Sequence, residues 1–184
     1  MSRLAIPALN DVPEASKPIL DKVEKVLGVV PNMFRLFATS PVALTGLTGL
    51  DAANARVLDL KTRTAIALAV AQVNGCEYCL SAHTYIGINL AKIGAEEARL
   101  NRQGKSANPE VAAAARFAVR VAEARGQVSD ADIADVRDAG FSDAQVVELV
   151  SVVVQNVLTN FLNNVARTDI DFPVVSADDI RNAA

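Results

Sequence analysis

At residues 74–83 the chain reads Asn-Gly-Cys-Glu-Tyr-Cys-Leu-Ser-Ala-His, and this stretch holds both cysteines and the only histidine of the 184-residue protein. A predominantly apolar run, residues 60–74, leads into it, and Gly75 interrupts the run. A glycine directly after an apolar helix is typical of a C-terminal cap, and a second helix can start at once. We therefore expect one helix over 60–74 and another that begins at Cys76.

The spacing places three reactive side chains on one face of this second helix. At about 100° per residue, Cys79 lies about 60° round the helix from Cys76, and His83 lies about 40° from Cys79. Only a thiolate attacks an electrophile, and a helix N-terminus and a nearby imidazole both favour its formation. A second cysteine three positions away can convert a sulfenic acid into a disulfide. The stretch predicts a redox-active dithiol with Cys76, Cys79 and His83 as catalytic residues.

Two other interpretations of these residues stay open. Cysteine is among the most buried residue types, so the pair could be inert core residues. Cys76, Cys79 and His83 could also supply three zinc ligands, but a structural zinc site needs four. The chain has no further cysteine or histidine to complete it. We expect no metal ion and no cofactor.

The motif resembles the core of a known family. Cys76-x-x-Cys79-x-x-x-His83 after an apolar helix is similar to the AhpD-like (alkylhydroperoxidase D) and carboxymuconolactone decarboxylase superfamily, above all to its peroxidase-related branch. Residues 31–34 (Pro-Asn-Met-Phe) and 169–173 (Asp-Ile-Asp-Phe-Pro) resemble the same branch, so the likeness covers most of the chain. It implies an all-α fold, a homo-oligomer (trimer or hexamer), and reduction of a hydroperoxide by the cysteine pair with His83 as proton relay.

The resemblance also implies separate roles for the two cysteines, with Cys79 meeting the peroxide and Cys76 resolving the product. Helix-dipole reasoning alone favours Cys76 as the attacking thiol, because Cys76 is nearer the helix start. One position departs from the family: AhpD carries a glutamate in its proton relay where this chain has Thr64. Threonine is no base near neutral pH, although it can hydrogen-bond an imidazole or a water. Tyr78 stands where some members have a second histidine. Decarboxylase activity is not expected, since that branch does not depend on a cysteine pair.

Composition argues against several classes of function. The chain is 51% hydrophobic, lacks tryptophan and has a formal net charge of −3, which does not suit nucleic acid or an anionic membrane surface. The N-terminus lacks a basic segment followed by a long apolar stretch, so we expect no signal peptide. No uninterrupted apolar run reaches about 18 residues, so we expect no membrane span. In a cytoplasmic protein, a close cysteine pair favours catalysis over a structural disulfide.

The chain is expected to form a single domain over 1–184, with an extended N-terminal arm (1–15) and a non-helical C-terminal tail (168–184) that could cross a neighbouring subunit. Strand alternation persists nowhere, so the expected fold is an all-α, AhpD-like helical bundle. Caps and apolar periodicity place the other helices at 16–27, 41–56, 95–103, 109–125, 130–139 and 142–167, and carry the cysteine helix on to 93. Ser16 is the expected cap of the first helix.

Two groups of side chains have alternative interpretations. In the apolar segment 33–37, Phe34 or Phe37 either packs in the core or roofs the thiol pocket. Tyr85, within two turns of Cys79, is expected to be a packing residue. The last helix carries amides on one face, which either hydrogen-bond between helices or subunits or border the thiol pocket. These amides are Asn156, Asn160, Asn163 and Asn164.

The sequence therefore predicts a homo-oligomeric, thiol-dependent, peroxidase-like oxidoreductase. Its partners would be a hydroperoxide substrate, a thiol reductant that the sequence does not identify, and copies of itself, because several helices lack a polar face. Nucleic acid and membrane are not expected partners. Two alternatives remain: a disulfide reductase or redox sensor that uses the same dithiol, and a non-catalytic assembly protein whose site has been silenced.

Overall fold

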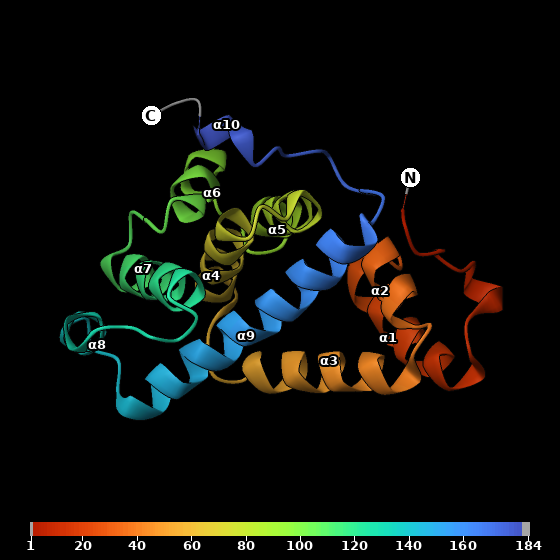
Figure 1. The fold of residues 1–184 in the computed structure, drawn as a ribbon, viewed down its shortest axis with the longest axis horizontal. Helices are drawn as coiled ribbons and strands as arrows, with labels where there is room; N and C mark the ends of the chain where they lie inside the picture. Colours follow the sequence, from red (N-terminus) through yellow and green to blue (C-terminus); the bar gives the residue numbers. More distant parts are fainter. Residues whose placement is uncertain (1, 182–184) are drawn as a thin grey trace.

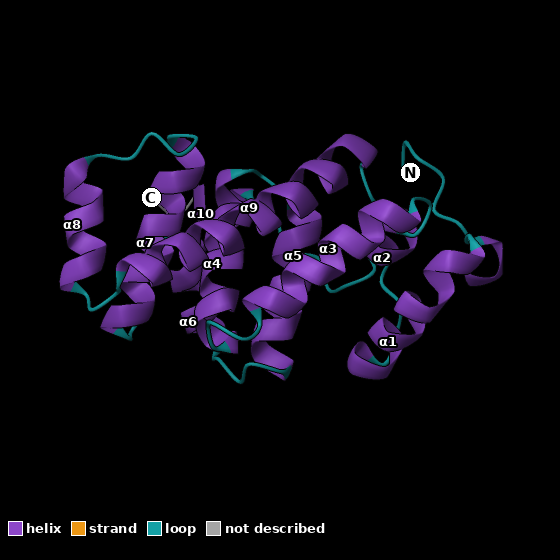
Figure 2. Ribbon diagram, turned by 90° about the horizontal axis from the view of Figure 1, so that it is seen from below, coloured by secondary structure: helices purple, strands orange, loops and turns teal. Residues whose placement is uncertain are grey.

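The computed structural model describes residues 2–181, and within that range the protein consists of helices and loops without strands (Figures 1 and 2). The all-α prediction is thus confirmed. The helices are α1 (Lys17–Leu27), α2 (Asn32–Phe37), α3 (Pro41–Asn54), α4 (Leu60–Val73), α5 (Glu77–Asn89), α6 (Ala95–Arg102), α7 (Pro109–Glu123), α8 (Asp130–Asp138), α9 (Asp143–Ala166) and α10 (Asp178–Arg181). Two 3₁₀ turns, η1 (Leu9–Asp11) and η2 (Glu14–Ser16), precede α1.

Helix α4 is the centre of the fold. Every residue from Thr64 to Ala71 is buried, and the helix contacts α5, α6, α7 and α9. Ala65 and Ala69 cluster with Ala115 of α7, and such small side chains allow two helices to approach closely. A helix that is apolar on all sides is stable only when neighbours cover it. The cysteine site therefore grows from a scaffold that packing holds rigid.

Helix α9 is the longest helix and crosses the molecule diagonally in Figure 1. Its valine-rich first half would suit a strand by propensity. A capping box decides otherwise: Ser142 Oγ accepts from the Gln145 N–H, and the Gln145 side chain accepts from the Ser142 N–H. Leu149, Val152 and Val153 then fill a core shared with α4, α7 and α8. The helix predicted over 142–167 is confirmed.

By length and composition, α9 is also apolar enough to cross a membrane. The absence of an uninterrupted apolar run had predicted that no segment would be. The contacts of α9 favour another interpretation. One face is buried against α3, α4 and α7, and that face carries asparagines with hydrogen bonds to their surroundings. A core helix with such a polar face is expected to pack in protein, where its amides find partners.

The N-terminal segment differs from the expected extended arm. It forms the two 3₁₀ turns, and Val12 is buried with Leu20 and Phe37 in a cluster against α3. The predicted cap of the first helix is wrong in mechanism. Ser16 does precede α1, but its hydroxyl donates to the Ala38 carbonyl at 2.8 Å and makes no cap hydrogen bond. Ser16 instead ties the segment before α1 to the end of α2.

The prediction that the cysteine helix continues to residue 93 is wrong, because α5 ends at Asn89. Beyond it the chain turns back through Lys92, which has a φ of +56°. The Ile93 N–H donates to the Gly87 carbonyl at 3.0 Å, and the Ile93 side chain packs over Gly87. Burying Ile93 against the end of the helix wins over extending the helix by one more turn.

The C-terminal tail also departs from expectation, because it packs on its own chain and includes the short helix α10. The Val175 N–H donates to Ser81 Oγ at 2.9 Å, and Gln72 Nε2 donates to the Ala177 carbonyl at 2.9 Å. Arg102 Nη2 donates to the Ser176 carbonyl at 2.6 Å. Figure 1 shows the tail passing α5 to reach α6.

Candidate functional site

The two cysteines lie where α4 passes into α5. Asn74 ends α4, and Gly75 follows with a φ of +60°, a left-handed conformation that glycine adopts readily. The Cys76 N–H donates to the Ala71 carbonyl at 2.9 Å, and Cys76 is the N-cap residue of α5. The predicted glycine turn and the place of Cys76 at a helix start are both confirmed.

Cys76 and Cys79 are joined by a disulfide with a Cα–Cα distance of 5.3 Å. The two residues are 0% and 2% exposed. The backbone N–H of Cys79 lies in the first turn of α5, where N–H groups have no carbonyl partner inside the helix. It donates to Cys76 Sγ at 3.2 Å. The two cysteines therefore lie in the core as a bonded pair.

A disulfide has no thiolate to offer a metal, so the zinc interpretation would apply only to the reduced pair. Within residues 2–181, no group of three or more His, Cys, Asp or Glu side chains is arranged to hold a metal ion.

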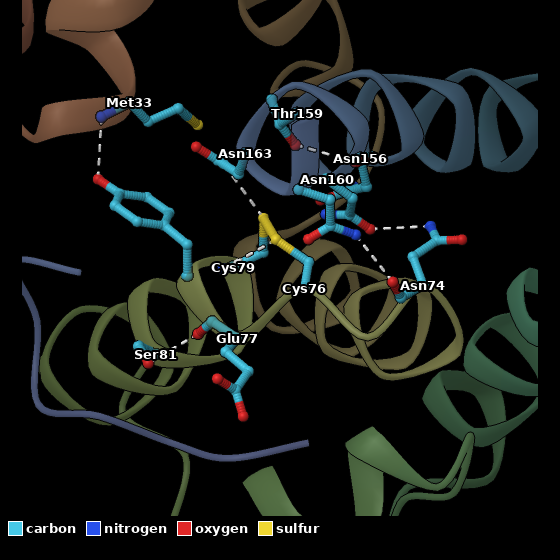
Figure 3. The surroundings of a disulfide bond; sticks show 12 residues. Met33, Asn74, Cys76, Glu77, Cys79, Ser81, Asn156, Thr159, Asn160 and Asn163 are labelled. Atoms are coloured by element: carbon cyan, nitrogen blue, oxygen red, sulfur yellow. Dashed lines mark hydrogen bonds between the residues drawn. A yellow bond between two sulfur atoms is a disulfide. The ribbon is translucent and has the colours of Figure 1, made fainter. Parts of the chain in front are cut away.

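Amides from α9 line one side of the disulfide (Figure 3). Asn163 Nδ2 donates to Cys79 Sγ at 3.4 Å. Asn160 Oδ1 accepts from Asn74 Nδ2 at 2.9 Å, and Asn164 Nδ2 donates to the Asn74 carbonyl at 2.9 Å. Both interpretations of the amide face thus hold for different members: two amides clamp α9 to the loop before Cys76, and Asn163 borders the sulfur.

His83 lies one turn after Cys79 on α5 and is partly buried. Burial lowers the pKa of the imidazole to about 4, with Asp51 of α3 opposing the shift and Arg63 of α4 adding to it. The ring is therefore neutral at pH 7. Among residues 2–181, no hydrogen bond joins it to either sulfur of the oxidised pair, so the predicted relay contact is absent from this state.

Thr64, at the position of the AhpD glutamate, is buried and supplies no base. Its hydroxyl donates to the Leu60 carbonyl at 2.7 Å, and its methyl group faces α5 beside Gly87. Asp51 is the carboxylate whose negative charge raises the pKa of His83, against the larger effect of burial. Gln155 Nε2 donates to Asp51 Oδ1 at 2.8 Å, and the Arg63 guanidinium lies 3.9 Å from the same oxygen.

The cover of the site comes from α2 and the tail. Met33 packs against the cluster that contains both cysteines, and its N–H donates to Tyr78 Oη at 3.1 Å. The Phe172 ring meets Tyr78 edge-on at 5.9 Å and Tyr85 at 5.7 Å, so Tyr85 does have a packing contact. Phe37 is buried in the N-terminal cluster instead. Phe34, the other predicted candidate, is partly buried against that same N-terminal cluster, so the side chain of α2 that packs on the cysteine cluster is Met33.

The two outlying segments that carry the family resemblance lie against each other. The Asn32 N–H donates to Asp171 Oδ2 at 2.7 Å, and Asn32 Nδ2 donates to the Asp169 carbonyl at 3.0 Å. Residues 31–34 and 169–173 thus form one substructure above Tyr78. Asn163 and Asn160 of α9 lie beside the disulfide, and Asn74 hydrogen-bonds Asn160. The only sequence signal for them was the asparagine next to Gly75 and the amide face of the last helix.

A separate surface cavity of about 470 Å³ lies between α6 and α7. Its lining includes Leu100, Lys105, Arg116 and Val119, and it includes neither cysteine. The disulfide and this cavity are therefore distinct places in the fold.

Comparison with known proteins confirms the resemblance seen in the motif. Residues 41–124, which run from α3 through α7 and include the disulfide, match the carboxymuconolactone decarboxylase family. No curated protein matches the chain significantly. A solved structure described as the alkylhydroperoxidase AhpD core of a peroxidase-related protein from Ralstonia eutropha JMP134 superposes with a TM-score of 0.82. It shares 25% sequence identity, and the match covers 92% of each chain.

Two further solved structures share the fold. A peroxidase-related protein from Silicibacter sp. TM1040 has a TM-score of 0.78 at 21% identity over 91% of each chain. A variant of the debrominase Bmp8, in complex with 2,3,4-tribromopyrrole, has a TM-score of 0.78 at 17% identity, covering 93% of this chain and 94% of its own. The fold is thus AhpD-like, and proteins that share it include a debrominase as well as peroxidase-related proteins.

Proposed function

From the carboxymuconolactone decarboxylase family match over residues 41–124 and the AhpD-like fold, we propose that this chain reduces hydroperoxides through the Cys76–Cys79 dithiol. The observation that carries the proposal is the disulfide at the N-terminus of α5. The two thiols are close enough to cycle between dithiol and disulfide, and a backbone amide and a side-chain amide each face one sulfur. Hydrogen bonds to a sulfur anion favour the thiolate that the reaction needs.

In the proposed reaction the Cys79 thiolate attacks a hydroperoxide oxygen, the O–O bond breaks, and an alcohol leaves. The Cys79 sulfenic acid is then attacked by Cys76, which forms the disulfide and releases water. His83 would take the thiol proton and return it to the leaving alkoxide. The ring is neutral and has a free lone pair, its lowered pKa makes it a weaker base than an ordinary imidazole, and the charge of Asp51 favours the imidazolium that results. A dithiol reductant would restore the pair.

The first experiment counts free thiols on reduced native protein before and after one equivalent of an organic hydroperoxide, with intact mass alongside. Loss of both thiols together with two hydrogens supports the proposal. In the variants, a sulfenate trap should label Cys79 in Cys76→Ser and find nothing in Cys79→Ser. Thiols that persist, or that react only after denaturation, would overturn the proposal and favour the non-catalytic assembly protein.

The competing activity of the same dithiol is thiol–disulfide exchange, as in a disulfide reductase or a redox sensor. The two activities separate when reduced protein is offered a hydroperoxide and a low-molecular-weight disulfide in parallel. Faster oxidation by the disulfide, at equal concentration, would replace the peroxidase proposal. We place either activity in the cytoplasm, where reductants can reset a redox-active pair.

We further propose that the chain is a homo-oligomer that associates through the outer face of α9. This face carries six exposed apolar side chains at helical spacing, and α9 has no charged residue between Glu148 and its end. They are Val147, Val150, Val154, Leu158, Phe161 and Val165. The stripe spans 19 residues, or about 27 Å of helix, which suits symmetric pairing of identical copies.

Light scattering after size exclusion tests the association. Val154→Glu with Phe161→Glu should lower the molar mass, because two charges would be buried in the interface. Val26→Glu, on the exposed face of α1, is the matched control and should change nothing. A parent protein that is already monomeric, or a double variant of unchanged mass, would refute the assignment.

A further inference from the structure

Among residues 2–181, two buried asparagines beside the disulfide have polar atoms without a partner. Asn163 is 3% exposed and Asn160 is 0% exposed. Asn163 Nδ2 donates a hydrogen bond to Cys79 Sγ, and the Oδ1 atom of the same side chain has no hydrogen bond. Asn160 accepts from Asn74 through Oδ1, and its Nδ2 group has no acceptor. Buried polar atoms are normally paired, so an unpaired donor and an unpaired acceptor beside a reactive sulfur can hydrogen-bond a polar group that the sulfur carries.

The other groups near the site do not serve the Cys79 sulfur. Thr64 donates to its own helix, and His83 has no hydrogen bond to either sulfur among the described residues. The backbone amide of Cys79 points at Cys76 Sγ. Asn163 is thus the one side chain in residues 2–181 that donates a hydrogen bond to Cys79 Sγ.

We propose that Asn163 and Asn160 form an amide pocket that stabilises the Cys79 thiolate and then the oxygen atom that Cys79 carries as a sulfenic acid. The pocket makes Cys79 the attacking cysteine and Cys76 the resolving one. This inference rests on the proposed hydroperoxide reduction and identifies the residues that direct it. Figure 3 shows both side chains reaching from α9 toward the disulfide, so the pocket belongs to a rigid helix.

Each atom of the pocket has a place in the reaction. Asn163 Nδ2 donates to the sulfur anion, a charge-assisted contact stronger than the contact to a neutral disulfide. When the thiolate attacks R–O–OH, an S–O bond forms, the O–O bond breaks, and the electron pair leaves as RO⁻, which takes the proton held by His83. Sulfur is oxidised by two electrons, and the hydroperoxide is reduced to the alcohol. The new S–OH group offers a proton to Asn163 Oδ1 and a lone pair to Asn160 Nδ2.

Formation of the disulfide then removes the oxygen atom from the amide pocket. The Cys76 thiolate attacks Cys79 Sγ, an S–S bond forms, the S–O bond breaks, and hydroxide leaves and is protonated to water. In the resulting disulfide, Asn163 Oδ1 and Asn160 Nδ2 again have no partner among the described residues. A dithiol reductant completes the cycle.

The test uses the Cys76→Ser protein, in which Cys79 is the only thiol and its titration can be assigned without ambiguity. Asn163→Leu removes the donor with little change of size, and Asn163→Asp keeps the shape but places an anion beside the thiolate. The thiolate pKa is followed by ultraviolet absorbance, and sulfenate formation by trapping at neutral pH. Asn156→Leu is the matched control, because Asn156 is a buried amide of α9 that donates to its own helix at Val152.

We expect Asn163→Leu to raise the Cys79 pKa by about one unit, which leaves about tenfold less thiolate at neutral pH. Sulfenate should form about tenfold more slowly, and more slowly still in Asn163→Asp. Asn160→Leu should leave the pKa nearly unchanged but shorten the lifetime of the sulfenic acid. Asn156→Leu should behave as its parent, and thermal unfolding of each variant shows that it folds.

The outcomes separate this inference from the proposed function. If Cys76→Ser forms sulfenate and both Asn163 variants react as fast as it does, the amide pocket is refuted and the hydroperoxide reduction stands. If sulfenate forms only in Cys79→Ser, Cys76 is the attacking cysteine and the inference is wrong. If neither single-cysteine protein reacts, the proposed function fails and the inference fails with it.

Discussion

Mild acid should destabilise the protein by about 1–2 kcal/mol through His83 alone. Burial lowers the pKa of this imidazole to about 4 in the folded chain, against about 6.5 when unfolded. Because the folded pKa is the lower one, the unfolded chain binds more protons in this window. Above pH 6.5 the ring is neutral in both states, so the folded protein keeps its full stability. As the pH falls from 6.5 toward 4, the ring is protonated only in the unfolded chain, and the unfolding free energy decreases. At pH 5 the linkage relation gives a loss of about 2 kcal/mol, reduced somewhat because the ring is only partly buried.

Urea unfolding of the oxidised protein at pH 7.5 and pH 5 measures this loss, with His83→Gln as the reference. Carboxylates titrate in both proteins, so the difference between the two pH effects isolates the imidazole. The chain contains one histidine, so its ring proton resonance in NMR is assigned without further work and reports the folded pKa directly.

Two results would refute this reasoning. One is an equal loss of stability in the parent and in His83→Gln, within about 0.5 kcal/mol, the usual limit of additivity. The other is a ring that titrates near 6.5. Either would mean that solvent reaches the imidazole freely, and that the fold does not keep it neutral in weak acid as a proton acceptor.

Four further changes test the packing and capping of the helices and the anchoring of the tail. Gly87→Ala should lower the unfolding free energy by about 1–3 kcal/mol, because its Cβ would lie 2.9 Å from a core isoleucine methyl. Gly46→Ala, which meets nothing within 4 Å, should raise that free energy by up to about 1 kcal/mol in the same urea assay. Asn108→Ala should cost about 1 kcal/mol in urea, because its side chain caps α7. Arg102→Gln should speed proteolytic cleavage of the tail without changing far-ultraviolet dichroism, since the guanidinium anchors Ser176.

The sequence predicts most helix boundaries because they depend on local chemistry. Gly28 ends α1 in the left-handed conformation, and Asn108 caps α7 through its own side chain. The same logic located Cys76 at the start of α5. It failed where a distant contact decides. Helix α5 ends early because Ile93 folds back onto Gly87, and Ser16 bonds Ala38 instead of capping α1.

The site itself was predicted in part. Helical spacing alone placed Cys76 and Cys79 within reach of each other, and the structure joins them. The surroundings depend on α9, which lies 84 residues from Cys79 where Asn163 meets it. Local patterns carry no information on which helix crosses which. The sequence predicts the amide face of the last helix, but it does not predict that Asn163 of this face donates to Cys79.

Part of the cover of the disulfide comes from a segment that is synthesised long after the two cysteines. Glu77 at the start of α5 accepts from the Ser176 hydroxyl, a partner 99 residues later. At translation speeds of about 5–20 residues per second, roughly 5–20 s separate the two. A nascent chain stalled before α9 therefore presents both cysteines to solvent, and its thiols should be fully alkylated there. The redox state of the newborn protein is set by its compartment, and the fold encloses that state only once α9 and the segment around Ser176 have been synthesised.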